Sequence, residues 1–245
     1  MARLETRVQQ IAGASEIDAA LREGAPIHFI LVQQDAKDGQ LPGLLERARA
    51  AGISVREASA SVLRRMSHLE PPSEVVALLG RRPGADLGEL LAESGAVWLL
   101  VGTSYPGNIG MAIRTAEVSG AEGIIIDAEL DREARKAALR FSVRADWYMP
   151  VLWERADSVL DRVAKTERRI IGIEDVGSRA PWEVDLTGSV LFVVGGERHG
   201  VPAAVLERCN DVVRIPTAGF IPSYNLQAAV AAIATERLRQ SASVS

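Results

Sequence analysis

The sequence predicts an α/β protein whose larger, C-terminal part is built on a parallel β-sheet. Three short stretches, WLLV at 98–101, GIII at 123–126 and LFVV at 191–194, are apolar at every position. Such strands are typical of parallel sheets that helices cover on both faces, because neither side of the strand reaches water. Helix-like segments alternate with these strands, which is the order that parallel strand connections require.

An N-terminal segment shows the same alternation on a smaller scale and predicts a compact αβ unit. Strand-like and helix-like patterns alternate over 27–32, 41–52, 53–58, 61–66 and 74–80. A polar stretch follows, in which Pro83 and Gly84 interrupt any regular pattern. We therefore expect a first domain over 1–80, a linker over 81–95 and a second domain over 96–245.

Within the second domain, the expected elements follow each other in a regular order. After a strand at 97–102 we expect a helix that follows Asn108 and a strand at 123–128. The remaining elements are helices over 131–140 and 155–166, strands at 169–175, 190–196 and 212–216, and a last helix over 225–240. The sequence shows no internal repeat and no low-complexity tract.

Composition argues against several classes of protein. No run of eighteen apolar residues occurs, and the N-terminal MARLETRVQQ lacks the apolar core of a signal peptide, so we expect no membrane partner and a cytoplasmic location. The single cysteine, Cys209, cannot form an internal disulfide, and the three histidines show no metal-ligand spacing, so we expect no metal. A net charge of −4 argues against bulk attraction to nucleic acid, although a local basic patch would still bind phosphates.

The first segment with chemical potential is PGNIGMAIRTAEVSG, which follows the tight turn at Tyr105. Asn108 opens the expected helix, and Arg114 lies two helical turns inward. Taken alone, Asn108 is explained as an N-cap and Arg114 as a solvated helix residue. Neither residue by itself indicates a function.

The second segment is LFVVGGERHGVP at 191–202, where a buried strand ends in two glycines. Gly195 and Gly196 would let a ligand approach the backbone, Glu197 follows, and Pro202 suits the first turn of a new helix. The carboxyl end of such a strand is a common ligand crevice in open α/β sheets. A lone GxExxG remains a weak signal, because glycines serve ordinary turns equally well.

The third segment, RIPTAGFIPSYNLQAAVAAIATERL at 214–238, combines a loop containing two prolines with an alanine-rich helix. Ser223, Tyr224 and Asn225 lead directly into this helix. Ser223 or Asn225 is explained most simply as its N-cap. The alanines, however, permit unusually close helix packing, which an isolated surface helix does not need.

In this order and at these intervals, the three segments together resemble the three signature motifs of the SpoU-TrmH (SPOUT) family of RNA ribose 2′-O-methyltransferases. The resemblance covers roughly residues 95–240. More loosely it extends over 25–80, where MSHLEPPSEVVALLG matches the end of a small ribosomal-protein-like RNA-binding domain. It implies a C-terminal trefoil knot, an obligate homodimer with the active site at its interface, RNA as substrate, and S-adenosyl-L-methionine as methyl donor without a metal.

The resemblance also assigns roles to particular residues. It implies that Arg114 acts on the target ribose, either by assisting proton removal through a substrate phosphate or by stabilising the developing alkoxide. The other catalytic candidates are Asn108, Glu197, Ser223 and Asn225, with fixation of the knotted loops as an alternative role for Glu197. The candidates for holding the cofactor are Val194, Gly195, Gly196, Gly200, Ile215, Pro216 and Leu226.

Four positions depart from the family pattern. Gly196 stands where Ser or Thr often precedes the glutamate, Thr217 where Met is usual, Tyr224 where Leu is usual, and Gln227 where a serine is common. These changes leave the polar candidates intact. They put the subfamily and the substrate in question rather than the activity.

Several functions stay open at this point. The N-terminal domain favours ribosomal RNA, particularly 23S rRNA, over transfer RNA, and Arg64 and Arg65 are candidates for phosphate contacts or merely solvate a helix. A role in antibiotic resistance is compatible with the same motifs. The rivals are a base methyltransferase, a non-catalytic RNA-binding protein of the same fold, and a Rossmann-like oxidoreductase suggested by the α/β alternation alone. Intact candidate residues argue against the non-catalytic alternative.

Overall fold

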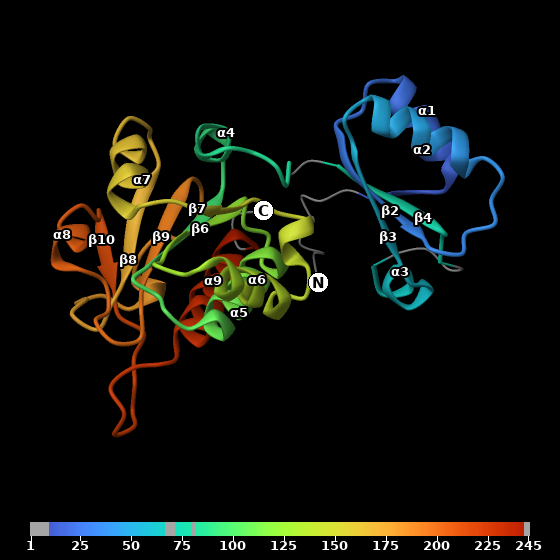
Figure 1. Ribbon diagram of the computed structural model, residues 1–245. Coiled ribbons are helices and arrows are strands. Elements are labelled where there is room, and N and C mark those ends of the chain that lie inside the picture. Colours follow the sequence, from blue (N-terminus) through green and yellow to red (C-terminus); the bar gives the residue numbers. More distant parts are fainter. Residues whose placement is uncertain (1–9, 67–71, 80–81, 243–245) are drawn as a thin grey trace. The chain divides into compact units, whose positions relative to one another are not determined.

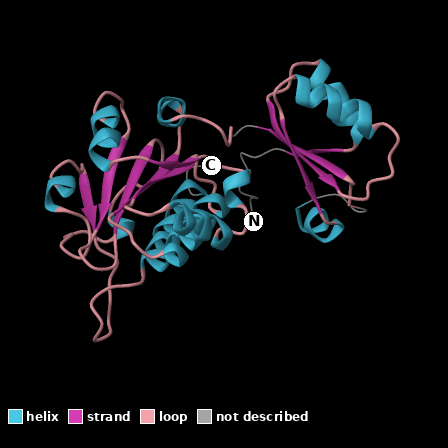
Figure 2. Ribbon diagram, viewed as in Figure 1, coloured by secondary structure: helices cyan, strands magenta, loops and turns pink. Residues whose placement is uncertain are grey.

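The structure is a computed structural model that describes residues 10–66, 72–79 and 82–242. The chain forms two compact units, which divide between Arg82 and Pro83. Each unit has its own sheet and its own buried core (Figures 1 and 2).

The N-terminal unit is a four-stranded mixed sheet with order β1-β4-β2-β3. Strand β2 pairs parallel with β3 and antiparallel with β4, which in turn pairs antiparallel with β1. The elements are β1 (Gln10–Ala12), α1 (Ala14–Arg22), β2 (Ile27–Gln33), α2 (Leu41–Ala50), β3 (Ser54–Ala58), α3 (Ala60–Met66) and β4 (Val75–Leu79). Helices α1 and α2 bury Ile17 and Leu44 against Ile30 of β2, so the central strand is apolar on the face that they cover.

The C-terminal unit has a six-stranded sheet with order β10-β8-β9-β5-β6-β7, and all of its strand pairs are parallel. Its strands are β5 (Ala96–Val101), β6 (Gly123–Asp127), β7 (Val151–Trp153), β8 (Arg169–Ile173), β9 (Val190–Gly195) and β10 (Asp211–Val213). Its α-helices are α4 (Leu87–Ala92), α5 (Pro106–Val118), α6 (Arg132–Phe141), α7 (Ala156–Val163), α8 (Ala203–Leu206) and α9 (Leu226–Ala242). Two 3₁₀ turns are η1 (Ala145–Trp147) and η2 (Pro181–Glu183).

Helices cover both faces of this sheet, as Figure 2 shows. One core lies between the sheet and helices α5, α6 and α9, and the other between the sheet and helices α4, α7 and α8. Trp98 and Leu99, neighbours on β5, are both fully buried and belong to opposite cores. The predicted α/β fold with a parallel sheet and a small αβ domain is therefore confirmed. The trefoil knot stays a prediction.

The segment 81–95, which we expected to be a linker, contains helix α4. Asp86 caps α4 by accepting a hydrogen bond from Glu89 N at 2.9 Å, and Leu90 is buried against the sheet. Behind α4, the buried guanidinium of Arg168 donates to the carbonyl of Gly95 at 2.6 Å and to that of Glu93. This part of the segment therefore packs as an element of the C-terminal unit.

Helices α5 and α9 pack against each other over small residues, as the alanine-rich sequence of α9 predicted. Ala112 and Ala116 of α5 and Ala229 of α9 are buried in one core. On α5, Gly110 permits close contact with α6, because a Cβ atom there would lie 2.3 Å from the carbonyl oxygen of Ala138. Small side chains thus bring the helices that carry the first and third motifs together.

Candidate active site

A pocket of about 580 Å³ lies at the carboxyl ends of β8, β9 and β10. Its walls come from the ends of these strands, the loop 195–200 and the segment that leads into α9. The lining residues are Ile173, Glu174, Asp175, Val194, Gly195, Gly196, Glu197, Arg198, His199, Gly200, Arg214, Ile215, Pro222, Ser223, Tyr224, Asn225, Leu226 and Ala229. The position agrees with the strand-end crevice that the sequence predicted.

The pocket contains most of the residues expected to hold a cofactor. Val194, Gly195, Gly196, Gly200, Ile215 and Leu226 all line it, together with Glu197, Ser223 and Asn225. Pro216 is exposed and does not line the pocket, although its carbonyl accepts a hydrogen bond from the Tyr224 hydroxyl at 3.3 Å. The second and third sequence segments therefore form one cavity.

A chain of side-chain hydrogen bonds joins all three segments. The Nδ2 atom of Asn108 donates to Oε1 of Glu197, which lies 89 residues away in the sequence. The Nδ2 atom of Asn225 donates to Oδ1 of Asn108 at 3.2 Å, across 117 residues. Asn108 uses both its donor and its acceptor in this chain, so it connects the glutamate loop to the start of α9.

The structure corrects one interpretation of Asn108 and supports another for Asn225. Asn108 is not the N-cap of α5: the helix begins at Pro106, and Asn108 is its third residue. Oδ1 of Asn225, in contrast, accepts from Gln227 N at 3.0 Å, in the manner of an N-cap at the start of α9. Asn225 therefore both caps a helix and belongs to the hydrogen-bonded chain.

The two glycines at the end of β9 are required by the chain's own backbone. A Cβ atom at Gly195 would lie 1.9 Å from the carbonyl carbon of Gly200, and one at Gly196 would lie 2.2 Å from the carbonyl oxygen of Gly102. Gly196 N donates to the carbonyl of Val101 at 2.8 Å. This hydrogen bond holds the end of β5 beside the residues that follow β9. Close approach of the protein's own backbone therefore accounts for both glycines. Because both also line the pocket, their contact with a ligand stays a prediction.

Arg114 lies apart from the pocket. Its side chain is exposed on α5 and is not among the lining residues, whereas Asn108 of the same helix reaches Glu197. On the same exposed face of α5, Met111 and Val118 precede and follow it by about one turn. Of the two candidates for RNA contacts in the N-terminal unit, Arg64 is exposed on α3, and the side chain of Arg65 lies outside the described residues.

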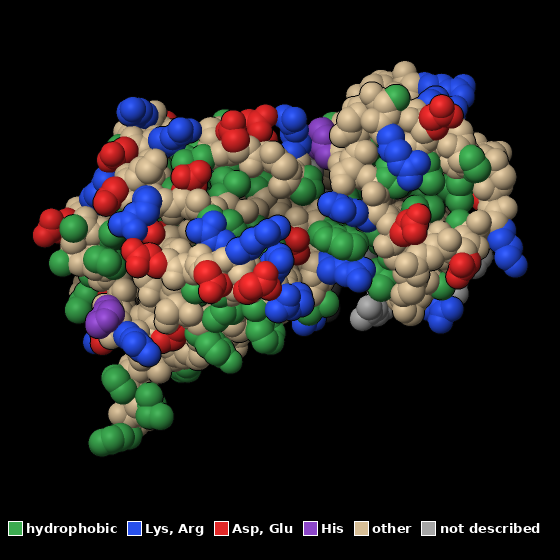
Figure 3. All heavy atoms as spheres, in the orientation of Figure 1, with side chains coloured by type: hydrophobic (Ala, Val, Ile, Leu, Met, Phe, Trp, Pro, Cys, Tyr) green, Lys and Arg blue, Asp and Glu red, His purple; other side chains and the backbone are tan. Residues whose placement is uncertain are grey.

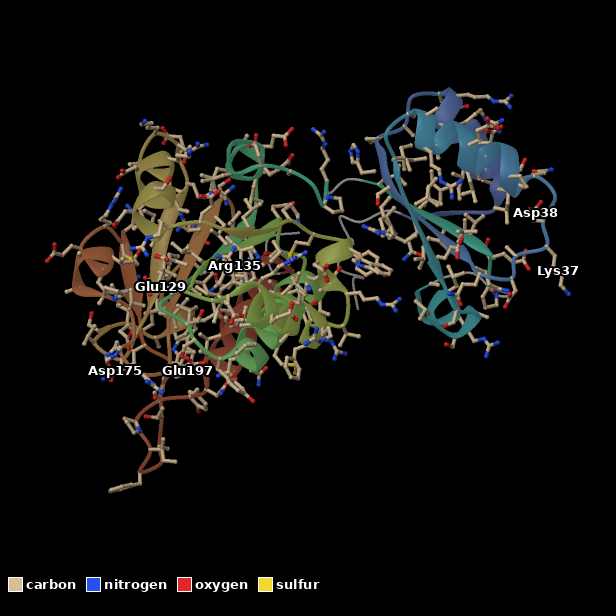
Figure 4. The ribbon with its side chains drawn as sticks, viewed as in Figure 1. Lys37, Asp38, Glu129, Arg135, Asp175 and Glu197 are labelled. Carbon is tan, nitrogen blue, oxygen red and sulfur yellow. The ribbon has the colours of Figure 1, made fainter. Side chains whose placement is uncertain are left out.

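Sequence reasoning missed the carboxylates that follow β8. Oε2 of Glu174 accepts a hydrogen bond from Val201 N at 2.6 Å, and Asp175 lies beside it in the pocket wall. Figure 4 shows Asp175 and Glu197 at the same end of the C-terminal unit. Glu174 and Asp175 follow an apolar strand directly, and this position could have identified them as site residues. The carboxyl ends of parallel strands share one edge of a sheet, where ligands bind.

The loop between β10 and α9 extends away from the domain (Figure 1). Within this loop Phe220 is fully exposed, and Ile221 is 74% exposed. Figure 3 shows apolar side chains on the part of the chain that protrudes there. The next three residues, Pro222, Ser223 and Tyr224, line the pocket.

Within the described part of the chain, no group of three or more histidine, cysteine, aspartate or glutamate side chains is arranged to hold a metal ion. Within the same part, no helix has the length and apolar character needed to cross a membrane.

Comparison with known proteins gives matches over nearly the whole chain. A TrmH-family protein of Staphylococcus saprophyticus is 27% identical over 239 residues, covering 94% of this chain and 95% of that protein. The 23S rRNA (guanosine-2'-O-)-methyltransferase RlmB of Haemophilus ducreyi is 26% identical over 241 residues, covering 95% of this chain and 98% of RlmB.

Solved structures agree with the sequence relatives. The SpoU methyltransferase AviRb of Streptomyces viridochromogenes is 26% identical with a TM-score of 0.60, and the match covers 99% of this chain and 93% of AviRb. The structure of AviRb in complex with the cofactor AdoMet gives a TM-score of 0.59 at 26% identity, covering 98% of this chain and 93% of AviRb.

Family models divide the chain where its two units divide. Residues 10–82 match the family described as RNA 2'-O ribose methyltransferase substrate binding. Residues 96–235, more than half of the 245 residues, match the SpoU rRNA Methylase family and contain all three hydrogen-bonded segments. The chain therefore belongs to the SpoU family of RNA methyltransferases.

Proposed function

We propose that this protein transfers a methyl group from S-adenosyl-L-methionine to a ribose 2′-hydroxyl of ribosomal RNA. The observation that carries the proposal is the hydrogen-bonded chain from Glu197 through Asn108 to Asn225 beside the pocket. The match of 10–82 to a ribose methyltransferase substrate-binding family supports the ribose as acceptor. The similarity to RlmB, whose name specifies 23S rRNA, favours ribosomal over transfer RNA.

The pocket suits S-adenosylmethionine in size and chemistry. Its volume of about 580 Å³ lies within the usual range for small-molecule sites. Ile215 and Leu226 offer apolar walls that suit a purine, and the carboxylates of Glu174, Asp175 and Glu197 suit a cationic sulfonium and ammonium. We assign Val194, Gly195, Gly196 and Gly200 to the same cofactor site. Pro216 would act on this site indirectly, through the lining residue Tyr224, whose hydroxyl donates to its carbonyl.

S-adenosylmethionine supplies a methyl group on positively charged sulfur. The ribose oxygen forms a new bond to this carbon, the sulfur–carbon bond breaks, and the hydroxyl proton leaves to a substrate phosphate or water. A guanidinium stays protonated in proteins, so we assign Arg114 to stabilising negative charge on the ribose oxygen. Asn108, Glu197, Ser223 and Asn225 keep the loops around the acceptor in place.

We further propose that the working enzyme is a cytoplasmic homodimer in which Arg114 serves the partner's pocket. Within one chain Arg114 is exposed and does not line the cavity, so a second chain would have to bring it there. The exposed Met111 and Val118 on the same face of α5 supply apolar surface for such a contact. The domain over 1–80, with Arg64 and Arg65 as candidates, would select the RNA.

The experiment is methyl transfer from tritiated S-adenosylmethionine to rRNA by two variants, alone and mixed. Arg114→Ala should lower turnover by about 100-fold or more while S-adenosylmethionine affinity stays within several-fold, because the guanidinium acts on the ribose. Asn225→Ala should also be inactive. Co-refolding the two variants should restore roughly a quarter of wild-type sites, since half of randomly paired dimers are mixed and each has one intact site.

The single variants test whether Arg114 takes part in methyl transfer, and the co-refolded variants test whether it acts on the partner's site. Near-normal turnover by Arg114→Ala would remove this residue from its role. If mass spectrometry verifies mixed dimers and no activity returns, each site is completed within a single chain.

A further inference from the structure

Helix α6 carries a line of exposed positive side chains that the motifs do not explain. Arg132, Lys136 and Arg140 follow each other at intervals of four residues, which places them on one face of the helix. All three are exposed, and the opposite face buries Ala138 in the core. We call Arg132, Lys136, Arg140 and the following Arg144 the α6 ridge.

The charge of the α6 ridge is a local exception in an acidic protein. The chain has a net charge of −4, yet residues 132–144 contain five positive side chains and one carboxylate, Glu133. Glu133 pairs with Lys136 at 2.8 Å, and both side chains are largely exposed. Arg132 is the first residue of α6, where the helix dipole disfavours positive charge. Its charge therefore does not stabilise the helix.

The end of the α6 ridge is held in a conformation that its residues disfavour. Val143 and Arg144 have φ angles of 56° and 69°, in the left-handed region where glycine is usual after a helix. The turn is fixed by its neighbours: the buried Ser142 hydroxyl donates to Leu139 O at 2.7 Å and also contacts Asp146. Strain that the surroundings enforce on non-glycine residues points to a function for the side chains.

The strained turn orients an arginine beside aromatic surface. The guanidinium carbon of Arg144 lies 4.5 Å from the ring centroid of Trp147, and this stacking restricts its direction. Phe141, at the end of α6, is 51% exposed. A guanidinium near an exposed aromatic ring is a combination that binds phosphates and unstacked bases of RNA.

The α6 ridge lies next to the helix that carries Arg114. A Cβ atom at Gly110 of α5 would lie 2.4 Å from Cβ of Phe141, so the two helices are in contact there. Arg114 follows Gly110 by four residues and therefore lies one turn further along the same side of α5. The two helices also lie on the same face of the sheet (Figure 1).

We propose that the α6 ridge binds the sugar-phosphate backbone of the RNA substrate, with Arg144 fixed on Trp147 as its terminal contact. The inference rests on the proposed function. From Arg132 to Arg140 the helix rises about 12 Å, which spans several nucleotides of a strand. The ridge contributes affinity and orientation of the RNA rather than recognition of particular bases.

The test compares two triple variants with the same change in charge. One carries Arg132→Gln, Lys136→Gln and Arg140→Gln on α6. The control carries Arg162→Gln, Lys165→Gln and Arg208→Gln on and after α7 and α8, which cover the other face of the sheet. Binding of the full-length proteins to 23S rRNA transcribed in vitro is measured against salt concentration, with S-adenosylmethionine binding and thermal unfolding as references.

We expect the α6 variant to bind this RNA at least tenfold more weakly, with a salt slope shallower by about 2, because three phosphate contacts are lost. The control should retain wild-type affinity and slope. Arg144→Gly should also weaken binding while its melting temperature stays the same or rises, since glycine relieves the left-handed backbone. A purely structural residue would not separate affinity from stability in this way.

Equal losses in both triple variants would reduce the effect to bulk charge and overturn the proposal, as would unchanged affinity of the α6 variant. Conversion of the α6 variant to a different oligomeric state, seen by sedimentation, would also overturn it and assign the ridge to chain contacts. If wild-type protein binds the RNA through the ridge but transfers no methyl group, the proposed function fails and the ridge stands.

Discussion

Asn225 donates a hydrogen bond of 3.2 Å from Nδ2 to Oδ1 of Asn108, although 117 residues separate them. Asn108 passes the connection to Glu197, so one amide links the start of α9 to the loop after β9. The bond fixes the relative position of two walls of the site. This hydrogen bond contributes little to the stability of the fold, on the order of 1 kcal/mol. A variant that loses the bond can therefore lose activity while its stability changes little.

Two substitutions at Asn225 should make that separation. Asn225→Asp keeps an oxygen for the N–H of Gln227, so the free energy of unfolding should change little. It places a carboxylate oxygen opposite Oδ1 of Asn108, which then loses its hydrogen-bond donor, so methyl transfer should fall strongly. Asn225→Ala should lose activity and also about 1 kcal/mol of stability. Urea unfolding and methyl transfer measured on both variants check this; equal activity of Asn225→Asp and wild type would contradict it.

Gly196 should not tolerate the serine that often occupies its position in related proteins. Its Cβ atom would lie 2.2 Å from the carbonyl oxygen of Gly102, so backbone would have to move. We expect Gly196→Ser to lose about 1–3 kcal/mol of stability and to bind S-adenosylmethionine more weakly. Gly219→Ala is the control, because its Cβ atom would meet nothing within 4 Å. If Gly196→Ser keeps the wild-type melting temperature and cofactor affinity, the prediction is wrong, and the backbone at Gly196 and Gly102 can move apart at little cost.

Arg168 should be more important for stability than any exposed arginine. Its guanidinium satisfies the carbonyls of Gly95 at 2.6 Å and Val190 at 3.1 Å behind α4. Arg168→Met fills similar volume but leaves these acceptors without donors, so we expect a loss of about 2–4 kcal/mol. Arg208→Met removes a pair with Asp161 in which the arginine side chain is 31% exposed and the aspartate 70% exposed, and it should cost less than about 1 kcal/mol. Similar losses in the two variants would show that the hydrogen bonds of Arg168 to these carbonyls add little to stability.

Sequence patterns predicted the parts of the fold that repeat locally. Strands β5, β6 and β9 were predictable because each is apolar at almost every position. Strands β1 and β7 were missed because three residues carry no period. Helix α4 was missed because Pro83 and Gly84 suggested a linker, although the capping pair Asp86 and Glu89 was a signal for it.

The candidate site was less accessible to sequence reasoning than the fold. The three segments could be named, but the bond between Asn108 and Asn225 depends on how α5 packs against α9. The collision that a Cβ atom at Gly196 would have with Gly102 depends on the close approach of the ends of β5 and β9. Such contacts come from tertiary packing, which a one-dimensional pattern does not contain.

Cys209 should be unreactive and should make the protein sensitive to alkaline pH. Burial raises the pKa of its thiol from an ordinary value of 9.0 to about 11. The folded state therefore holds this proton more tightly than the unfolded state, so the thiol's contribution to stability is present below pH 9 and is lost as the pH rises towards 11. Iodoacetamide at pH 8 should modify Cys209 slowly until the protein unfolds. In Cys209→Ala the free energy of unfolding should fall less between pH 9 and 11; an identical fall in wild type would contradict the assignment.

Nucleoside analysis of the modified RNA tests methyl transfer to the ribose most directly. Ribosomal RNA that lacks the modification is incubated with the protein and S-adenosylmethionine, digested to nucleosides and analysed by mass spectrometry, with Arg114→Ala as the inactive control. We expect one 2′-O-methylated nucleoside, formed only with wild-type protein and in proportion to the S-adenosylmethionine consumed. A methyl group on a base, or cofactor binding without any methylated nucleoside, would contradict it.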